Sequence, residues 1–352
     1  MNKNLSNILK YILWIVVAVV LLYFSFRGVN WKDFGAALHY CHWEYVALSL
    51  VLGGFVLFVR GLRWRMQLLP VDPSTSWLTC WNAYNICMIV NLVLPRVGEV
   101  VRCGYVTRHS SRDAEGNRLA TLDKVIGTVL VDRIWDAVSL LTILIILLSV
   151  LWKRFGAFFT ETVFPGLQDK AGLWWILVLA VAAAAGFVWL CWKLRDRGAV
   201  WGKVWGYIVG IKEGLSSCLH MKNGWLFIVY TIVIWGSYWL MSACIMWSLQ
   251  GIDPSLVSPE MAETLGKIDS LTMADALFLM FAGALSSVVP VPGGFGAFHF
   301  IVAGALSYTY GIPFGFGMIF ATLSHESQAI NQIIWGMISY ISEHFRKNNN
   351  EV

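Results

Sequence analysis

The chain has 352 residues, of which 58% are hydrophobic and only 13% are charged, and its formal net charge is +5. Soluble domains average about 25% charged residues and about 45–50% apolar residues. A soluble globule of this size cannot bury so much apolar surface, so the composition excludes a soluble enzyme, a disordered chain and a secreted disulfide scaffold. No Lys/Arg block of the kind that binds nucleic acid is present. The composition favours a single integral membrane domain over residues 1–352.

Apolar runs that are candidates for membrane segments recur along the chain. The first follows Lys3 and Lys10, and the stretch Ser25–Gly28 is a poor signal-peptide cleavage site, so we expect an uncleaved first span. The runs predict an all-α fold, a polytopic transmembrane helical bundle with about 7–9 hydrophobic segments. The expected segments are Ile8–Phe26, Tyr45–Val59, Trp77–Leu94, Leu122–Trp152, Leu173–Trp192, Trp225–Leu249, Met273–Val289, Phe295–Tyr310 and Phe314–Ile341.

Lys and Arg gather in particular connecting segments, and this asymmetry predicts the orientation of the chain. Segments 95–121 and 193–222 are rich in Lys and Arg, whereas segment 250–272 carries mostly acidic charges. Because cytoplasmic loops carry the excess of Lys and Arg, we expect the first two segments inside and the third outside. The basic tail at Arg346 and Lys347 is expected inside as well, so both termini are predicted to be cytoplasmic.

Counting the crossings creates a conflict that a hairpin removes. If Trp77–Leu94 crossed the membrane, the Arg-rich segment after it would lie outside. We therefore predict a re-entrant hairpin near 77–103 that is broken at Pro95, and a second hairpin over Met273–Tyr310 that is broken at Pro290–Gly296. A pair of Pro/Gly-interrupted segments, one in each half of the chain, is typical of a transport site. The alternative is that both are ordinary short helices joined by loops.

The first candidate binding residues follow Pro95. Arg96 and Arg102 can make bidentate contacts to a phosphate, and Glu99 can pair with either of them or face a cationic headgroup or a proton. The alternative is a cytoplasmic loop with a local salt bridge.

The second candidate site is the glycine-rich stretch Pro290–His299. Gly293, Gly294 and Gly296 expose backbone amides, and a helix beginning near Phe295 would add the partial positive charge of its N-terminus. His299 would lie in the first turn of that helix and can titrate near neutral pH. The alternative is a tight turn in which glycine permits close helix packing.

Two further polar groups lie inside apolar runs. Asp132 and Asp136 are four residues apart and share one face of a long run, and Arg133, three residues before Asp136, can pair with it. A structural ion pair from this run to an Arg of the hairpin and a role in a site both remain open.

In the last run, His325, Gln328 and Gln332 form a polar stripe that should face the protein interior. His325 and Glu326 do not form an HExxH motif, because position 329 is Ala, and neither a metal site nor a P-loop is predicted.

The motifs at Pro95–Arg102 and Pro292–Gly296 make the chain resemble the lysylphosphatidylglycerol synthase transmembrane region, also called the flippase-like domain family. The resemblance covers nearly the whole chain. It implies a polytopic bacterial or archaeal inner-membrane domain that moves or handles polar lipids. A binding role is carried over to Arg96, Glu99, Arg102 and Gly293–Gly296. This chain has His299 where the family often has Glu, and it ends at Val352 without the aminoacyl-transferase domain, so we expect no lysyl-lipid synthesis.

The leading hypothesis is a lipid flippase of the bacterial inner membrane. A phosphate-bearing headgroup would bind in a central cavity between the two hairpins, with His299 and His325 adjusting the charge. One alternative is a membrane-embedded transferase with Glu99 or His299 as general base. Another is a non-catalytic membrane partner of a lipid or cell-envelope enzyme. No cofactor or nucleic-acid partner is expected, and a homo-oligomer or a partner enzyme stays open.

Overall fold

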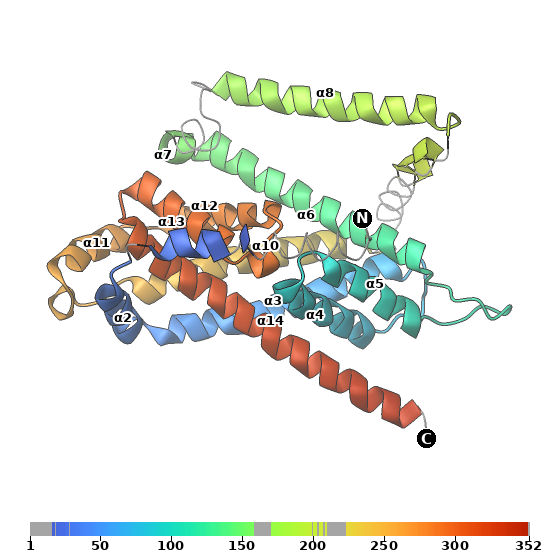
Figure 1. Ribbon diagram of the computed structural model, residues 1–352, viewed down its shortest axis with the longest axis horizontal. Coiled ribbons are helices and arrows are strands. Elements are labelled where there is room, and N and C mark those ends of the chain that lie inside the picture. The colour runs from blue at the N-terminus through green and yellow to red at the C-terminus, as the bar shows by residue number, and fades with distance from the viewer. Residues whose placement is uncertain are drawn as a thin grey trace. The chain divides into compact units, whose positions relative to one another are not determined.

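A computed structural model describes residues 16–157, 170–209 and 223–350, apart from positions 18, 28, 199, 203 and 207. The chain divides into two compact units. Unit 1 comprises Met1–Leu122 and Trp225–Val352, and unit 2 comprises Asp123–Gly224. All regular structure in the described ranges is helical, with no strand among those residues, so the predicted all-α fold is confirmed (Figure 1).

The helices among the described residues divide between the two units. In unit 1 they are α2 (Trp31–Tyr40), α3 (Trp43–Leu68), α4 (Trp77–Val93), α5 (Val97–His109), α10 (Gly224–Leu249), α11 (Pro259–Asp269), α12 (Met273–Leu285), α13 (Ala297–Tyr310) and α14 (Phe314–Asn350). Short 3-10 turns lie at η2 (Pro254–Leu256), η3 (Ser286–Val288) and η4 (Pro292–Gly294). Unit 2 holds α6 (Leu122–Val150), which begins at its boundary, α7 (Trp152–Ala157) and α8 (Lys170–Leu194).

Within the described residues, 3 helices are long and apolar enough to cross a membrane, namely α3, α6 and α10. The pair Pro259–Asp269 and Met273–Val288 passes the same test together but is bent by 103°, which raises the number of spans to 4 if the pair counts as one. These helices support a membrane protein, while the larger number of segments predicted from the sequence is not confirmed. Part of the predicted first span and much of segment 193–222 lie outside the described residues.

The first predicted hairpin is formed by α4 and α5, which pack side by side. The chain turns at Leu94–Arg96, where the sequence places the break, and Arg96 adopts a left-handed conformation with a φ of 64°. The Asn91 side chain fixes the turn, because its Oδ1 accepts a hydrogen bond of 2.9 Å from the backbone amide of Gly98. A Cβ atom at Gly98 would collide with the carbonyl oxygen of Cys87, so only glycine lets α5 approach α4 this closely.

Asp72 ties together the two ends of this first hairpin. Its carboxylate, in the loop before α4, accepts hydrogen bonds of 2.7 Å from Ser110 Oγ and 2.8 Å from Ser111 Oγ, which follow α5. Burial alone would raise the pKa of Asp72, but hydrogen bonds from Ser74, Ser110 and Ser111 outweigh it and lower the pKa to about 2. The carboxylate is therefore charged at neutral pH. Its hydrogen bonds hold the start and the end of the hairpin next to each other.

The second predicted hairpin is formed by α12 and α13, with η3 and η4 at its tip. The Tyr310 hydroxyl at the end of α13 donates a hydrogen bond of 2.7 Å to Asp275 in the first turn of α12, which closes the base of this hairpin. At the tip, Gly293, Gly294 and Gly296 have positive φ values of 57°, 79° and 78°. L-residues rarely adopt such angles, so the glycines permit the turn that the sequence predicts at Pro290–Gly296.

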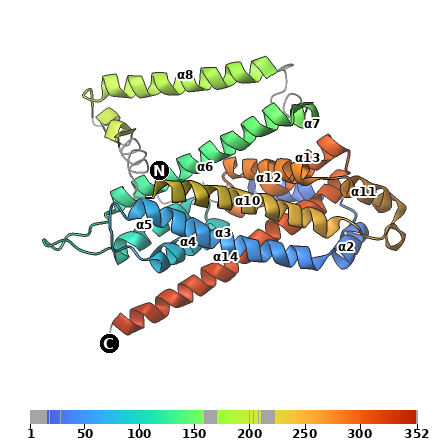
Figure 2. The same ribbon diagram turned by 180° about the vertical axis from the view of Figure 1, so that it is seen from behind.

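The long helix α14 packs against both hairpins and against α3. Near its start, Gly317 faces Ala303 of the second hairpin. Further along, Gly336 faces Ile89 of the first hairpin, and Ser339 accepts a hydrogen bond of 3.0 Å from Asn85. Within unit 1, α4 and α5 therefore lie toward one end of α14, while α12 and α13 lie toward the other (Figure 1 and Figure 2).

The glycine at the α4–α5 contact yields a matched pair of substitutions. Gly98→Ala forces a Cβ atom against the Cys87 carbonyl, and overpacking of this kind costs about 1–3 kcal/mol of unfolding free energy. Gly104→Ala lies on the same helix with no atom within 4 Å of the new Cβ, so it should leave stability equal or slightly higher. Thermal unfolding of the purified chain in detergent measures both. Equal midpoints for the two variants would contradict this packing.

Candidate functional site

The tips of the two hairpins meet in unit 1. The Arg96 guanidinium, at the turn of the first hairpin, donates a hydrogen bond of 3.2 Å to the backbone carbonyl of Ser287 in η3. Leu92, at the end of α4, packs against η4, where a Cβ atom on Gly293 would lie 3.0 Å from Leu92 Cδ2. Arg96 and Ser287 are 191 residues apart in sequence. The two backbone breaks are therefore distant in the chain but adjacent in the fold.

Arg96 is held in an unusual conformation at this place. Among the described residues it is the only one other than glycine with a positive φ. A left-handed conformation costs an L-residue about 1–2 kcal/mol, so the surrounding turn must hold it there. The side chain is exposed and extends toward the second hairpin. The turn therefore keeps the positive charge of Arg96 at the junction of the two hairpin tips.

Glu99 lies in the first turn of α5, beside Arg96 in the chain. Its Oε2 accepts a hydrogen bond of 3.2 Å from Asn91 Nδ2, and the residue is half-buried. A carboxylate in the first turn is stabilised by the partial positive charge of the helix N-terminus. Asn91 therefore links the end of α4 to both Gly98 and Glu99.

Arg102 has different surroundings from Arg96. It is fully buried, and its guanidinium carbon lies 4.7 Å from the ring centroid of Trp64 and 5.3 Å from that of Tyr84. Arg60 of α3 reaches the same region, where it donates hydrogen bonds of 2.9 Å to the Tyr84 hydroxyl and 3.0 Å to the Tyr238 hydroxyl. Arg60, which directly follows the expected segment Tyr45–Val59, therefore adds to a buried cationic region between α3, α4, α5 and α10.

Backbone amides of the glycine-rich tip donate hydrogen bonds to carbonyls of the same turn. The amide of Gly294 donates to the carbonyl of Val291 at 3.2 Å, and the amide of Phe295 donates to the carbonyl of Pro292 at 3.1 Å. One of the three glycine amides expected to face an anion, that of Gly294, thus closes the turn itself. Helix α13 begins at Ala297, and the amides of its first turn point back toward the tip, as at any helix N-terminus.

Behind the tip, α13 and α14 bring together His299, His325 and Glu326. The His325 ring lies under the glycine turn, with Nε2 2.9 Å from the carbonyl oxygen of Gly293. Glu326 Oε1 lies 3.3 Å from His325 Nδ1 and 3.5 Å from His299 Nε2. The two histidines are buried, while the Glu326 side chain is 40% exposed. Sequence reasoning selected both histidines and missed Glu326 as their common partner.

Other polar residues of the apolar runs make hydrogen bonds and an ion pair within the protein. Asn331, on the same helix as His325, donates a hydrogen bond of 2.9 Å to the carbonyl of Leu50, and Gln328 donates to the carbonyl of Ser324. His325 is buried and Gln328 half-buried, as expected for a stripe that faces protein. In unit 2, Arg133 and Asp136 are 3.9 Å apart and form the predicted pair within α6.

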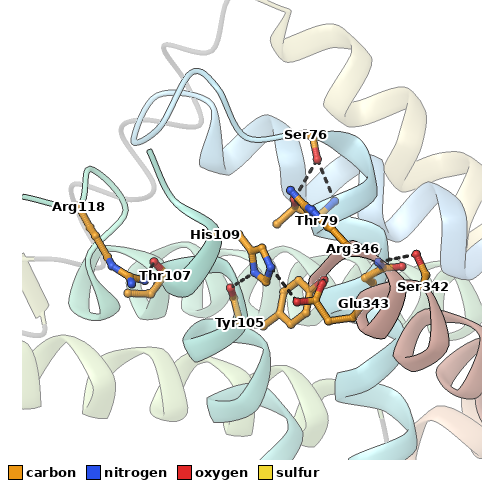
Figure 3. Close-up of polar contacts among 10 residues, drawn as sticks. Ser76, Thr79, Tyr105, Thr107, His109, Arg118, Ser342, Glu343 and Arg346 are labelled. Carbon is orange, nitrogen blue, oxygen red and sulfur yellow. Dashed lines mark hydrogen bonds and ion pairs between the residues drawn. The ribbon is translucent and has the colours of Figure 1, made fainter. Parts of the chain in front are cut away.

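A polar contact between α14 and the first hairpin was missed from the sequence (Figure 3). The Tyr105 hydroxyl donates to Glu343 Oε2 at 2.6 Å, and His109 Nε2 lies 3.0 Å from Glu343 Oε1. One turn further along α14, Arg346 donates to Thr79 Oγ1 at 3.2 Å. These pairs are more than 200 residues apart in sequence, as |i−j| = 238 for the Tyr105–Glu343 contact, so no local pattern indicates them.

These features define a helical membrane protein in which two broken hairpins meet against one long helix. The chain belongs to the family of the lysylphosphatidylglycerol synthase TM region, whose family model matches residues 11–336. The match includes residues of both units and confirms the resemblance seen in the sequence. Neither a curated protein nor a solved structure matched the chain. Family membership identifies a membrane protein linked to lipid metabolism.

The contact of Tyr105 with Glu343 can be tested with one atom removed. Tyr105→Phe deletes the donor to a half-buried carboxylate, and a hydrogen bond to a charged group contributes about 1.5–3 kcal/mol. We expect a lower thermal midpoint in detergent. Tyr340→Phe, at an exposed position of α14, the helix that carries Glu343, should leave the midpoint unchanged. A Tyr105→Phe variant as stable as the wild type would show that this contact does not hold α14 to the hairpin.

Proposed function

We propose that the protein moves a polar lipid with a phosphate-bearing headgroup across the membrane, as a flippase. The observation that carries this proposal is the meeting of two broken hairpins beside an exposed arginine. Broken backbone at membrane depth is tolerated only against protein or along a water-filled cavity. Pairs of interrupted segments that converge in this way are typical of transport sites.

The dimensions of the hairpins favour a junction inside the bilayer. The 17 residues of α4 make a helix of about 26 Å, and the 14 residues of α13 make one of about 21 Å. Placed end to end, they match the thickness of a bilayer with its headgroup regions, about 40–45 Å. Each hairpin is closed at its base, by Asp72 in one case and by Tyr310 with Asp275 in the other. We therefore propose that both are re-entrant and enter from opposite faces.

The proposed binding site assigns a role to each candidate residue. Arg96 would bind the phosphate together with the first turn of α13 and the backbone amides of Gly293 and Gly296, while Gly294 would shape the turn through its bond to Val291, because bare phosphate is costly to desolvate. Arg102 would add a buried positive charge that attracts the headgroup without touching it. Glu99, His299 and His325 would adjust the charge of the passage, and the acyl chains would stay in lipid.

The proposed orientation places the base of the first hairpin, the part of the Arg-rich segment 95–121 that follows α5, and both termini in the cytoplasm of a bacterial cell, with the chain in the inner membrane. The basic end of α14 lies against the base of the first hairpin through Arg346 and Thr79, so both basic segments belong to the same side. This agrees with the rule that cytoplasmic segments carry the excess of Lys and Arg.

Lipid translocation by the purified chain in reconstituted vesicles tests the proposal. Removing a charged hydrogen-bond donor of about 1.5–3 kcal/mol should slow translocation of headgroup-labelled phosphatidylglycerol by roughly 10- to 100-fold in Arg96→Ala. Arg108→Ala, at an exposed position of the same helix α5, removes equal charge away from the hairpin tip and should retain the wild-type rate.

Equal rates for the wild type, Arg96→Ala and Arg108→Ala would contradict the proposal. Covalent change of the labelled lipid, detected by mass spectrometry of the same vesicles, would favour the transferase instead.

A further inference from the structure

His299 and His325, to which the proposed passage assigns the adjustment of charge, form with Glu326 a group whose composition and spacing go beyond that role. The three side chains each offer one ligand atom, and these atoms all lie within 4.8 Å of one another. They come from α13 and α14, two helices that pack directly against each other in unit 1. The group is therefore held by rigid elements, as a binding site needs to be.

The orientation of His325 is fixed by the glycine turn. A carbonyl oxygen only accepts hydrogen bonds, so His325 Nε2, 2.9 Å from the Gly293 carbonyl, must carry the hydrogen. In the neutral ring, Nδ1 then presents a lone pair, and it lies 3.3 Å from the carboxylate oxygen of Glu326. Two acceptors that face each other at this distance require either a proton or a metal ion between them. A ring nitrogen that donates to a backbone carbonyl is also the usual outer contact of a metal-binding histidine.

His299 independently points to a ligand at the same place. The residue is 1% exposed, and neither ring nitrogen has a hydrogen-bond partner among the described residues. Leaving a buried polar group in this state costs about 1–3 kcal/mol. Its Nε2 lies 3.5 Å from the same oxygen of Glu326 that faces His325. A ligand bound by His299 Nε2, His325 Nδ1 and Glu326 Oε1 would satisfy these three atoms.

The geometry points to a site for a divalent transition-metal ion of the Zn²⁺ class, held by His299 Nε2, His325 Nδ1 and Glu326 Oε1. Ligand bonds of about 2.0–2.2 Å at tetrahedral angles place neighbouring ligand atoms about 3.3–3.5 Å apart. The two separations from Glu326 are 3.3 and 3.5 Å, and the two ring nitrogens lie within 4.8 Å of each other, so the rings would turn toward the ion as it binds. Two imidazoles select such an ion over Mg²⁺ or Ca²⁺, which prefer oxygen ligands.

Three protein ligands leave one position of a tetrahedral ion open. Glu326 is the exposed member of the group, so the open position lies on its side and would take water or an anion oxygen. The positive charge of the ion would offset the Glu326 carboxylate beside the hairpin tips. The sequence alone did not predict this site, because His325 and Glu326 are adjacent and do not form a zinc motif.

Metal binding to the full chain in detergent tests the inference without reference to lipid movement. After chelation and dialysis, titration with Zn²⁺ should show one high-affinity ion per chain, and Co²⁺ should give the intense visible absorption of a four-coordinate site. His299→Ala and Glu326→Gln should each weaken Zn²⁺ binding by at least about 10-fold, the loss typical even for outer contacts of a metal. His39→Ala, an exposed histidine on α2, is the matched control and should bind like the wild type.

Other outcomes would overturn the site. Wild-type chain that binds no Zn²⁺ would mean that the two histidines and Glu326 share a proton instead. Equal Zn²⁺ affinity in His299→Ala, Glu326→Gln and His39→Ala would assign the ion to other histidines. Should Glu326→Gln fail to fold, the Co²⁺ spectrum of the wild type still decides the question, because a six-coordinate spectrum or none contradicts the three-ligand geometry.

Discussion

A helix that breaks inside a membrane protein leaves backbone groups that lipid cannot satisfy, and this constraint explains the arrangement of unit 1. The two hairpins break at Leu94–Arg96 and over 286–296. Each break meets a group from elsewhere in the chain. Arg96 donates to the Ser287 carbonyl, and His325 of α14 donates to the Gly293 carbonyl. The hairpin tips and the middle of α14 therefore depend on one another, and the candidate site lies where they meet.

The sequence predicted the breaks because proline and glycine act locally. Pro95 cannot continue a helix, and the glycines after Pro292 permit positive φ, so their positions needed no knowledge of the fold. The hairpin near 77–103 followed from charge counting, since an Arg-rich segment outside would violate the orientation rule. That the two tips meet was a hypothesis from the pairing of interrupted segments, and the structure brings them together.

Contacts between distant segments were beyond the sequence. The sequence does not indicate that Arg96 and Arg102 have different surroundings. In the structure the Trp64 and Tyr84 rings enclose Arg102, whereas Arg96 reaches η3. Glu326 was overlooked because the contact that makes it a site candidate is with His299, which lies on another helix. The number of membrane segments predicted from the apolar runs is not confirmed, since short helices in hairpins and full spans share the same composition.

The meeting of the two hairpin tips is tested most directly by crosslinking in native membranes. Arg96→Cys with Ser287→Cys, treated with a short bifunctional thiol reagent, should yield a linked peptide by mass spectrometry. The cysteines at described positions are buried and should compete little for the reagent. Arg108→Cys with Ser287→Cys is the control, because Arg108 lies about 18 Å further along α5. Linkage of the control pair alone, or of neither pair, would contradict the account.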